Sequence, residues 1–154
     1  MAWPDVYGLD ESKFDRNTPT APRRPTIILV HDAWHTPAHL HALAEEIRTA
    51  EYRVLVPELL SSNSSYQADS FEGDVRSVVE CARPEIERGL DVIVVCHGYS
   101  ALPGSVAAAR LHQHSLNRPR AGDVTKLVFF AGIIVKPDEC CEDVFDPGWV
   151  SEEV

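Results

Sequence analysis

Short apolar runs alternate with amphipathic stretches along the chain. Four of the runs are rich in β-branched and aliphatic residues and have the length of strands that are buried on both faces of a parallel sheet. They are Thr26–Val30, Tyr52–Val56, Asp91–Val95 and Lys126–Val135. Helices are predicted after each of the first three runs, beginning near Thr36, Ser70 and Ala101. This alternation predicts an α/β fold, a doubly wound and mostly parallel sheet of about four strands with helices on both faces.

Local signals define the ends of these helices. Thr36 and Ser70 are expected as N-caps, with Pro37 at the first helical position. Pro84 is expected to kink the second helix, and Gly89 to close it from the C′ position. Right-handed crossovers lead us to expect successive helices on opposite faces of the sheet.

Composition divides the chain into three parts. Residues 1–25 contain four prolines and no sustained hydrophobic period, which predicts a flexible N-terminal arm. Residues 26–137 carry the strand and helix pattern and form the predicted core. Residues 138–154 are rich in Asp and Glu and are interpreted as an acidic tail. With 154 residues in total, the chain is the size of one domain.

The third strand runs directly into a sharp turn and then a helix. The segment Cys96-His97-Gly98-Tyr99-Ser100 links Val95 to the helix that starts at Ala101. Strand, turn and helix form the architecture of a nucleophile elbow, whose usual signature G-x-S-x-G places a serine at the apex. Here the apex, three residues past the strand, is Gly98. If the strand instead continued through His97, Ser100 would be the candidate nucleophile, with Leu102 in place of the last glycine.

Several segments together resemble the α/β-hydrolase superfamily, of the α/β-hydrolase-1 type, and especially its fungal branch close to plant esterases and hydroxynitrile lyases. The matching segments are His31–His35 (HDAWH), Asp69–Phe71 (DSF), His97–Gly104 (HGYSALPG), Lys126–Ala131 (KLVFFA) and Pro137-Asp138. The resemblance covers about residues 26 to 139. It implies a hydrolase-like core in which Gly98 replaces the nucleophilic serine. It also implies a chain that ends before the segments that usually supply the acid and the histidine of the triad.

The same resemblance assigns a candidate site at the carboxyl edge of the sheet. It implies that the backbone N–H groups of Ala33 and Tyr99 are the oxyanion donors, with His31 and Trp34 beside them. Asp32 stands where a glycine is usual. An ionised Asp32 would oppose an oxyanion, or it could move protons with His31 or His97, or it could be a solvated loop residue.

The residues of the candidate site are compatible with three functions. In the first, the chain lacks a working triad and acts as a small-molecule-binding or assembly module. In the second, it is a non-hydrolytic lyase, cyclase or condensation enzyme for a small carbonyl metabolite, with His97 as a general base or otherwise as a structural histidine. In the third, it is a weak serine esterase that uses Ser100, which is otherwise a residue that helps to cap the helix.

Charge and composition limit the kinds of partner that the protein is expected to bind. The formal net charge of −10 argues against nucleic acid and anionic membranes. Four histidines crowd one segment, yet no HExxH or CxxC motif accompanies them, so we expect no metal site and no cofactor. They are His31, His35, His39 and His41. The four cysteines fit no disulfide framework, and residues 1–25 lack the apolar run of a secretory signal, which favours a cytoplasmic protein.

The last predicted strand raises the question of association. In the family's sheet order, residues 127–135 form a long apolar edge strand. An unpaired apolar edge is a template for pairing with another chain. We therefore expect a homodimer, or a partner chain, through this edge.

Overall fold

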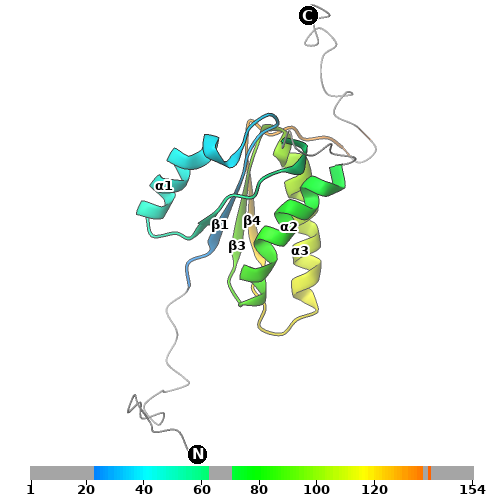
Figure 1. The fold of residues 1–154 in the computed structure, drawn as a ribbon. Helices are drawn as coiled ribbons and strands as arrows, with labels where there is room; N and C mark the ends of the chain where they lie inside the picture. Colours follow the sequence, from blue (N-terminus) through cyan, green and yellow to red (C-terminus); the bar gives the residue numbers. More distant parts are fainter. Residues whose placement is uncertain (1–22, 63–70, 137–138, 140–154) are drawn as a thin grey trace, which may run out of the picture.

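The computed structural model describes residues 23–62, 71–136 and 139, and Figure 1 shows how they are arranged. The strands are β1 (Thr26–Val30), β2 (Val54–Leu55), β3 (Val92–His97) and β4 (Val124–Phe130). The α-helices are α1 (His41–Thr49), α2 (Phe71–Glu87) and α3 (Ala101–Leu116). Three short 3-10 turns are η2 (Pro37–Leu40), η3 (Leu60–Ser62) and η4 (Gly98–Ser100).

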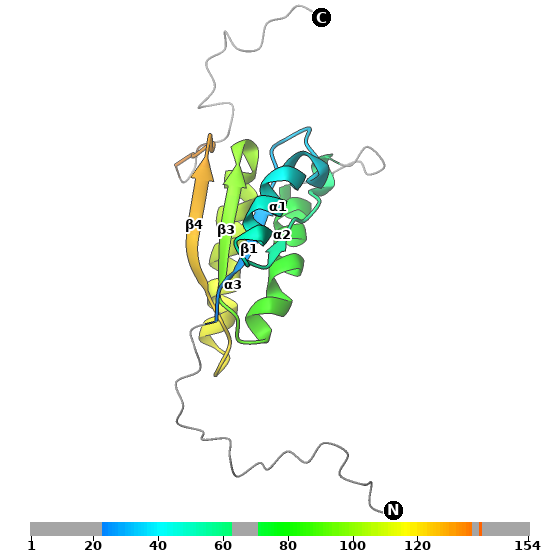
Figure 2. The same cartoon turned by 90° about the vertical axis from the view of Figure 1, so that its left-hand side faces the viewer.

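The described strands form one parallel sheet in the order β2-β1-β3-β4 (Figure 2). β1 and β3 lie at its centre and pair from Thr26 opposite Val92 to Val30 opposite Cys96. All five residues of β1 are buried, because helices cover both of its faces. The prediction of a mostly parallel α/β sheet of about four strands is confirmed.

The helices divide unequally between the two faces (Figure 1). α1 packs on one face, where Leu40 and Ala44 meet Ile27 and Leu29. α2 and α3 pack together on the other face, over a core of buried aliphatic residues. That core includes Ile28, Val30, Val75, Val78, Ile86, Val92, Val94, Ala107 and Leu111.

The expectation that successive helices lie on opposite faces was wrong for α2 and α3. The chain crosses the sheet in one direction from β1 to β2 and in the reverse direction from β2 to β3 and on to β4. Because each crossover is right-handed, the two that run in the same direction place their helices on the same face.

Several element bounds differ from the prediction. β2 is shorter than Tyr52–Val56, and β3 continues two residues further, through His97. β4 ends at Phe130 instead of Val135. Ala131 has a φ of 48° and the Ile133 N–H donates to the Gly98 carbonyl at 3.1 Å, so the chain after β4 turns toward the elbow and leaves the sheet.

The helix ends follow local chemistry in most respects. Gly89 has a φ of 77° directly after α2, and its N–H bonds the Ile86 carbonyl at 2.9 Å, as predicted for C′. Pro37 does start a helical segment, but its first turn is the 3-10 turn η2. Pro84 lies inside α2. Ser70, most of the predicted arm and almost all of the tail lie outside the described residues.

The order of the strands predicts where a ligand crevice opens. The chain leaves β1 toward one side of the sheet and leaves β3 toward the other. Loops that diverge from two neighbouring parallel strands open a crevice at their carboxyl ends, which is where α/β sheets bind ligands. Here those loops begin at His31 and Gly98, the two segments that carry the predicted site.

Candidate functional site at the carboxyl ends of β1 and β3

The turn after β3 has the backbone of a tight elbow. Gly98 has a φ of 56°, in the left-handed region that glycine adopts without strain. A Cβ added at Gly98 would overlap the carboxyl group of Asp32, which lies directly above it. The space that a side chain at the apex would occupy is thus filled by a residue of the loop after β1.

Asp32 is held there by two backbone N–H groups. Its Oδ1 accepts from the Ala33 N–H at 2.8 Å and from the Tyr99 N–H at 2.6 Å. These are the two groups that the sequence predicted as oxyanion donors, and they do converge on one oxygen atom. Sequence reasoning foresaw the donors but not that Asp32 is their acceptor. The side chain is part-buried and bonded to the backbone, unlike a freely solvated loop aspartate.

Ser100 faces the interior of the protein. It is fully buried, and its Oγ lies 2.9 Å from both the Val30 and the His97 carbonyl oxygens. The same Oγ accepts the His97 N–H at 2.9 Å. The strand does continue through His97, as the Ser100 interpretation required. The turn nevertheless sends the hydroxyl toward β1, where it ties the two central strands together.

His31 is fully buried directly after β1 and is hydrogen-bonded on both ring nitrogens. Its Nε2 accepts the Leu59 N–H at 3.2 Å, so the ring proton is on Nδ1, which donates to the Asp32 carbonyl oxygen at 2.9 Å. Burial lowers the pKa of His31, outweighing the hydrogen bond to Asp32 and the nearby Asp74 charge, which both raise it. The ring is therefore a neutral structural group, and its bond is to the backbone of Asp32.

The remaining candidates lie on the α1 side of the crevice. Strand alternation places His97 on the same face as Ile93 and Val95. Its ring stacks on Phe130 at 4.4 Å between centroids and lies 5.8 Å from the ring of His35. Trp34, with a φ of 58°, is 94% exposed. The structure therefore groups His97 with aromatic neighbours, whereas Trp34 is directed to solvent.

Asp74 is a site residue that sequence reasoning missed. It is fully buried on α2 and accepts hydrogen bonds from the Ser61 N–H at 2.9 Å, the Ser61 hydroxyl at 2.6 Å and the Tyr99 hydroxyl at 2.8 Å. It thereby fixes the Tyr99 side chain next to the elbow. The signal was present in the sequence, because Asp74 shares the apolar face of the helix with Val78, one turn later.

The described residues offer neither a metal-binding group nor a reactive thiol. None of their His, Cys, Asp and Glu side chains form a group of three or more placed to hold a metal ion. Burial raises the pKa of Cys96 to about 12 and that of Cys81 to about 11, so neither thiol is a ready nucleophile. In the parts of the chain that the structure describes, no helix has both the length and the apolarity to cross a bilayer.

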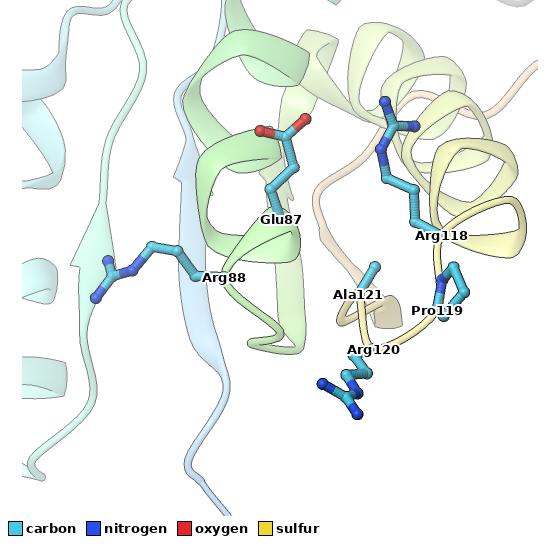
Figure 3. A pocket seen from close by; sticks show the side chains of 6 residues that line it. All are labelled: Glu87, Arg88, Arg118, Pro119, Arg120 and Ala121. Carbon is cyan, nitrogen blue, oxygen red and sulfur yellow. The ribbon is translucent and has the colours of Figure 1, made fainter.

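A hollow of about 510 Å³ lies at the opposite end of the sheet, where β3 and β4 begin (Figure 3). Its lining includes Arg88, Arg118 and Arg120, but their side chains point in different directions (Figure 3). Arg88 bonds Glu85 at 3.2 Å and Arg118 lies 3.0 Å from His114. These guanidinium groups do not converge on a common point, and the hollow does not belong to the candidate site.

Known proteins resemble the chain over the same region. No family model matches. An α/β hydrolase of Aspergillus novofumigatus (strain IBT 16806), nvfD, is 27% identical over 124 residues, which are 80% of this chain and 49% of that protein. An extracellular α/β-hydrolase from a Paenibacillus species superimposes with a TM-score of 0.65 at 19% identity, covering 82% of this chain and 48% of the other. The chain has the α/β-hydrolase fold.

A second solved structure supports the same conclusion. Tomato methylketone synthase I, complexed with 2-tridecanone, superimposes with a TM-score of 0.57 at 18% identity, covering 75% of this chain and 43% of that one. The predicted resemblance to α/β hydrolases is therefore confirmed, and it extends to the fold. The chain spans about half the length of the relatives it matches.

Proposed function

We propose that this α/β-hydrolase-fold protein does not hydrolyse esters and acts as a small-molecule-binding or assembly module. The observation that carries the proposal is the elbow itself. Its apex, Gly98, has no side chain, and the hydroxyl of Ser100 is buried against the Val30 and His97 carbonyls. Acyl transfer needs an attacking oxygen at the apex with a base in reach.

Asp32 adds a second obstacle to acyl transfer. The two N–H groups that would stabilise an oxyanion already donate to its carboxylate. A substrate oxygen would have to displace a hydrogen-bonded carboxylate, which carries a negative charge when ionised, before it could be stabilised. The same obstacle applies to an enolate, and the lyase or cyclase alternative therefore has less support than the binding function.

The proposal is tested with a fluorophosphonate probe and short p-nitrophenyl esters. We expect no labelling and no turnover above heat-denatured protein, both for the natural chain and for Ser100→Ala. Gly98→Ser is expected to stay unlabelled as well, because Asp32 occupies the space that the new side chain needs. Labelling of the natural chain that is lost in Ser100→Ala would overturn the proposal in favour of a Ser100 esterase.

Ligand binding is tested with a neutral ketone. Tomato methylketone synthase I was solved with 2-tridecanone, and in this chain the rings of His97 and Phe130 stack at the carboxyl ends of β3 and β4, while Trp34 is exposed in the loop after β1. We expect saturable quenching of tryptophan fluorescence by 2-tridecanone that is lost in Trp34→Phe, with the ketone recovered unchanged. Deuterium exchange at the ketone's α-carbon that is abolished by His97→Ala would favour the lyase alternative instead.

Assembly through β4 is the other part of the proposal. β4 pairs only with β3 among the described strands, and its outer residues Val128 and Phe130 are exposed on the α1 side. α1 packs against residues of β1 and β2, so it leaves this part of the sheet open (Figure 2). These features support association of two copies, or of a partner chain, along β4.

A further inference from the structure

The carboxylate of Asp32 is held by two backbone N–H groups at the carboxyl end of the sheet. Two N–H groups from different loops, those of Ala33 and Tyr99, meet at one carboxylate oxygen at 2.8 and 2.6 Å. Distances of this size are typical of charge-assisted hydrogen bonds and of donors aimed at an oxyanion. The donors come from the ends of β1 and β3, the two strands that border the crevice.

Gly98 is the counterpart that makes this occupancy possible. A Cβ at position 98 would overlap the Oδ1, Cγ and Oδ2 atoms of Asp32. A side chain at the apex and a carboxylate on the two N–H groups therefore exclude one another in this backbone. The two unusual residues of the site are explained together: a glycine at the apex leaves the room that the aspartate fills.

We propose that the Ala33 and Tyr99 N–H groups form a binding site for a carboxylate that Asp32 fills from within the chain. While Asp32 is in place, the crevice rejects anionic ligands, by steric overlap and by like charge when the carboxylate is ionised. Removal of the carboxyl group opens the site to small carboxylates such as acetate. This inference rests on the contacts alone and does not require the proposed function, which is tested by covalent labelling and ketone binding.

The experiment compares the natural chain with Asp32→Ala and Asp32→Asn. Asparagine keeps an oxygen that can accept both N–H groups, so it is the matched control in which the site stays filled. The probe is sodium acetate, with sodium chloride at the same ionic strength as the reference. We expect acetate to raise the Tm of Asp32→Ala by about 2–4 °C and to leave the other two proteins unchanged. Amide resonances of Ala33 and Tyr99 should move with acetate in Asp32→Ala only.

Two results would overturn the inference. One is the absence of any acetate-specific shift in Asp32→Ala, and the other is an equal shift in the natural chain. If Asp32→Ala does not fold, the natural chain and Asp32→Asn decide the question. The amide protons of Ala33 and Tyr99 should then resonate further upfield in Asp32→Asn, because a neutral acceptor replaces a charged one. Unchanged resonances would contradict occupancy by the carboxylate.

The reciprocity of Asp32 and Gly98 is tested separately. Gly98→Ala introduces the same left-handed strain in any background, since φ is 56° there. The overlap with the carboxyl group exists only when Asp32 is present. Gly98→Ala should therefore lower the Tm of the natural chain more than that of Asp32→Ala. Equal losses in the two backgrounds would show that the two positions are independent.

Discussion

Single side chains at the ends of β1 and β3 decide what this crevice can do. The Ser100 hydroxyl is hydrogen-bonded to the backbone of the two central strands, and His31 links the β1 loop to Leu59. The Asp32 carboxylate accepts hydrogen bonds from both N–H donors. Each of these residues is polar and hydrogen-bonded within the protein. These polar groups therefore stabilise the fold. Because they are already hydrogen-bonded within the protein, they support a binding role over a catalytic one.

Ser100→Ala should destabilise the protein without changing its chemistry. The substitution leaves the part-buried His97 N–H without its acceptor and removes the donor from the Val30 and His97 carbonyls. We expect a loss of about 1–3 kcal/mol in the free energy of unfolding, measured by urea denaturation. Ser105→Ala on α3 is the control, because its Oγ only donates back to the Ala101 carbonyl. A loss no larger than in that control would contradict the structural role of Ser100.

His31 should make stability depend on pH in a definite direction. Burial holds the folded-state pKa of His31 below 6.5, the ordinary value that applies to the unfolded chain. Between these two pKa values the unfolded chain takes up a proton at His31 and the folded protein does not. Stability contributed by the neutral ring is therefore complete above pH 6.5 and falls as the pH drops below it. The slope from this one group is at most about 1.4 kcal/mol per pH unit.

The matched variant for this test is His31→Gln, whose side-chain oxygen can still accept the Leu59 N–H. Chemical denaturation of both proteins between pH 7.5 and 5.0 measures the difference in slope, so that the other titrating groups cancel. The natural chain should lose more free energy of unfolding than the variant below pH 6.5. Parallel pH profiles would show that His31 titrates alike in the folded and unfolded chain.

At the scale of elements, the elbow depends on close packing of α3 against β3. Gly104 lies in the first turns of α3, and a Cβ there would overlap Sγ of Cys96 on the strand. The helix can thus approach the sheet only because position 104 has no side chain. The same packing keeps Cys96 buried and its thiol protonated, with its pKa raised to about 12.

Gly104→Ala should therefore destabilise the protein, although alanine favours a helix by about 1 kcal/mol over glycine. We expect a net loss of about 1–3 kcal/mol from overpacking, measured by thermal and urea unfolding. Cys96→Ala should relieve part of this loss in the double variant, which isolates the contact between the two positions.

Gly73→Ala on α2 is the control for this substitution. A Cβ there would lie 3.1 Å from the end of the Leu60 side chain, which can adjust, so the expected effect is small or favourable. A Gly104→Ala protein as stable as Gly73→Ala would contradict close packing of α3 on β3 at position 104.

For the whole molecule, the open side of the sheet at β4 predicts association. Val128 is 41% exposed on an edge strand, on the face that α1 leaves open. We expect the chain to sediment as a dimer or larger species at tens of micromolar, and Val128→Lys to shift it to monomer. Leu116→Lys is the control, because Leu116 is 69% exposed but belongs to the end of α3 and not to β4.

Two results would contradict association through β4. The first is a monodisperse monomer of the natural chain at these concentrations, without binding of a dye for exposed apolar surface. The second is equal dissociation by both lysine substitutions, which would place the contact elsewhere. If the Val128→Lys protein remains associated and the Leu116→Lys protein does not, the interface lies at the end of α3.

The sequence by itself determined the architecture. Runs such as Thr26–Val30 are apolar on both sides of the strand, and Gly89 has a left-handed φ, so periodicity and turn chemistry were enough to predict a parallel sheet with its helices. The likeness to the α/β-hydrolase fold came from the resemblance of separate segments to that superfamily. The resemblance to α/β hydrolases also implied the Ala33 and Tyr99 donors, and backbone N–H groups can be kept there whatever the side chains are.

Only the tertiary structure decided how these parts meet. The carboxylate of Asp32 lies 67 positions from its partner Tyr99, and Ser100 turns inward because the Val30 carbonyl of another strand is there to accept its hydroxyl. The side on which α3 packs depends on the direction in which the chain crosses the sheet. These outcomes depend on contacts between distant segments, and no period or motif along the chain encodes the distance between them.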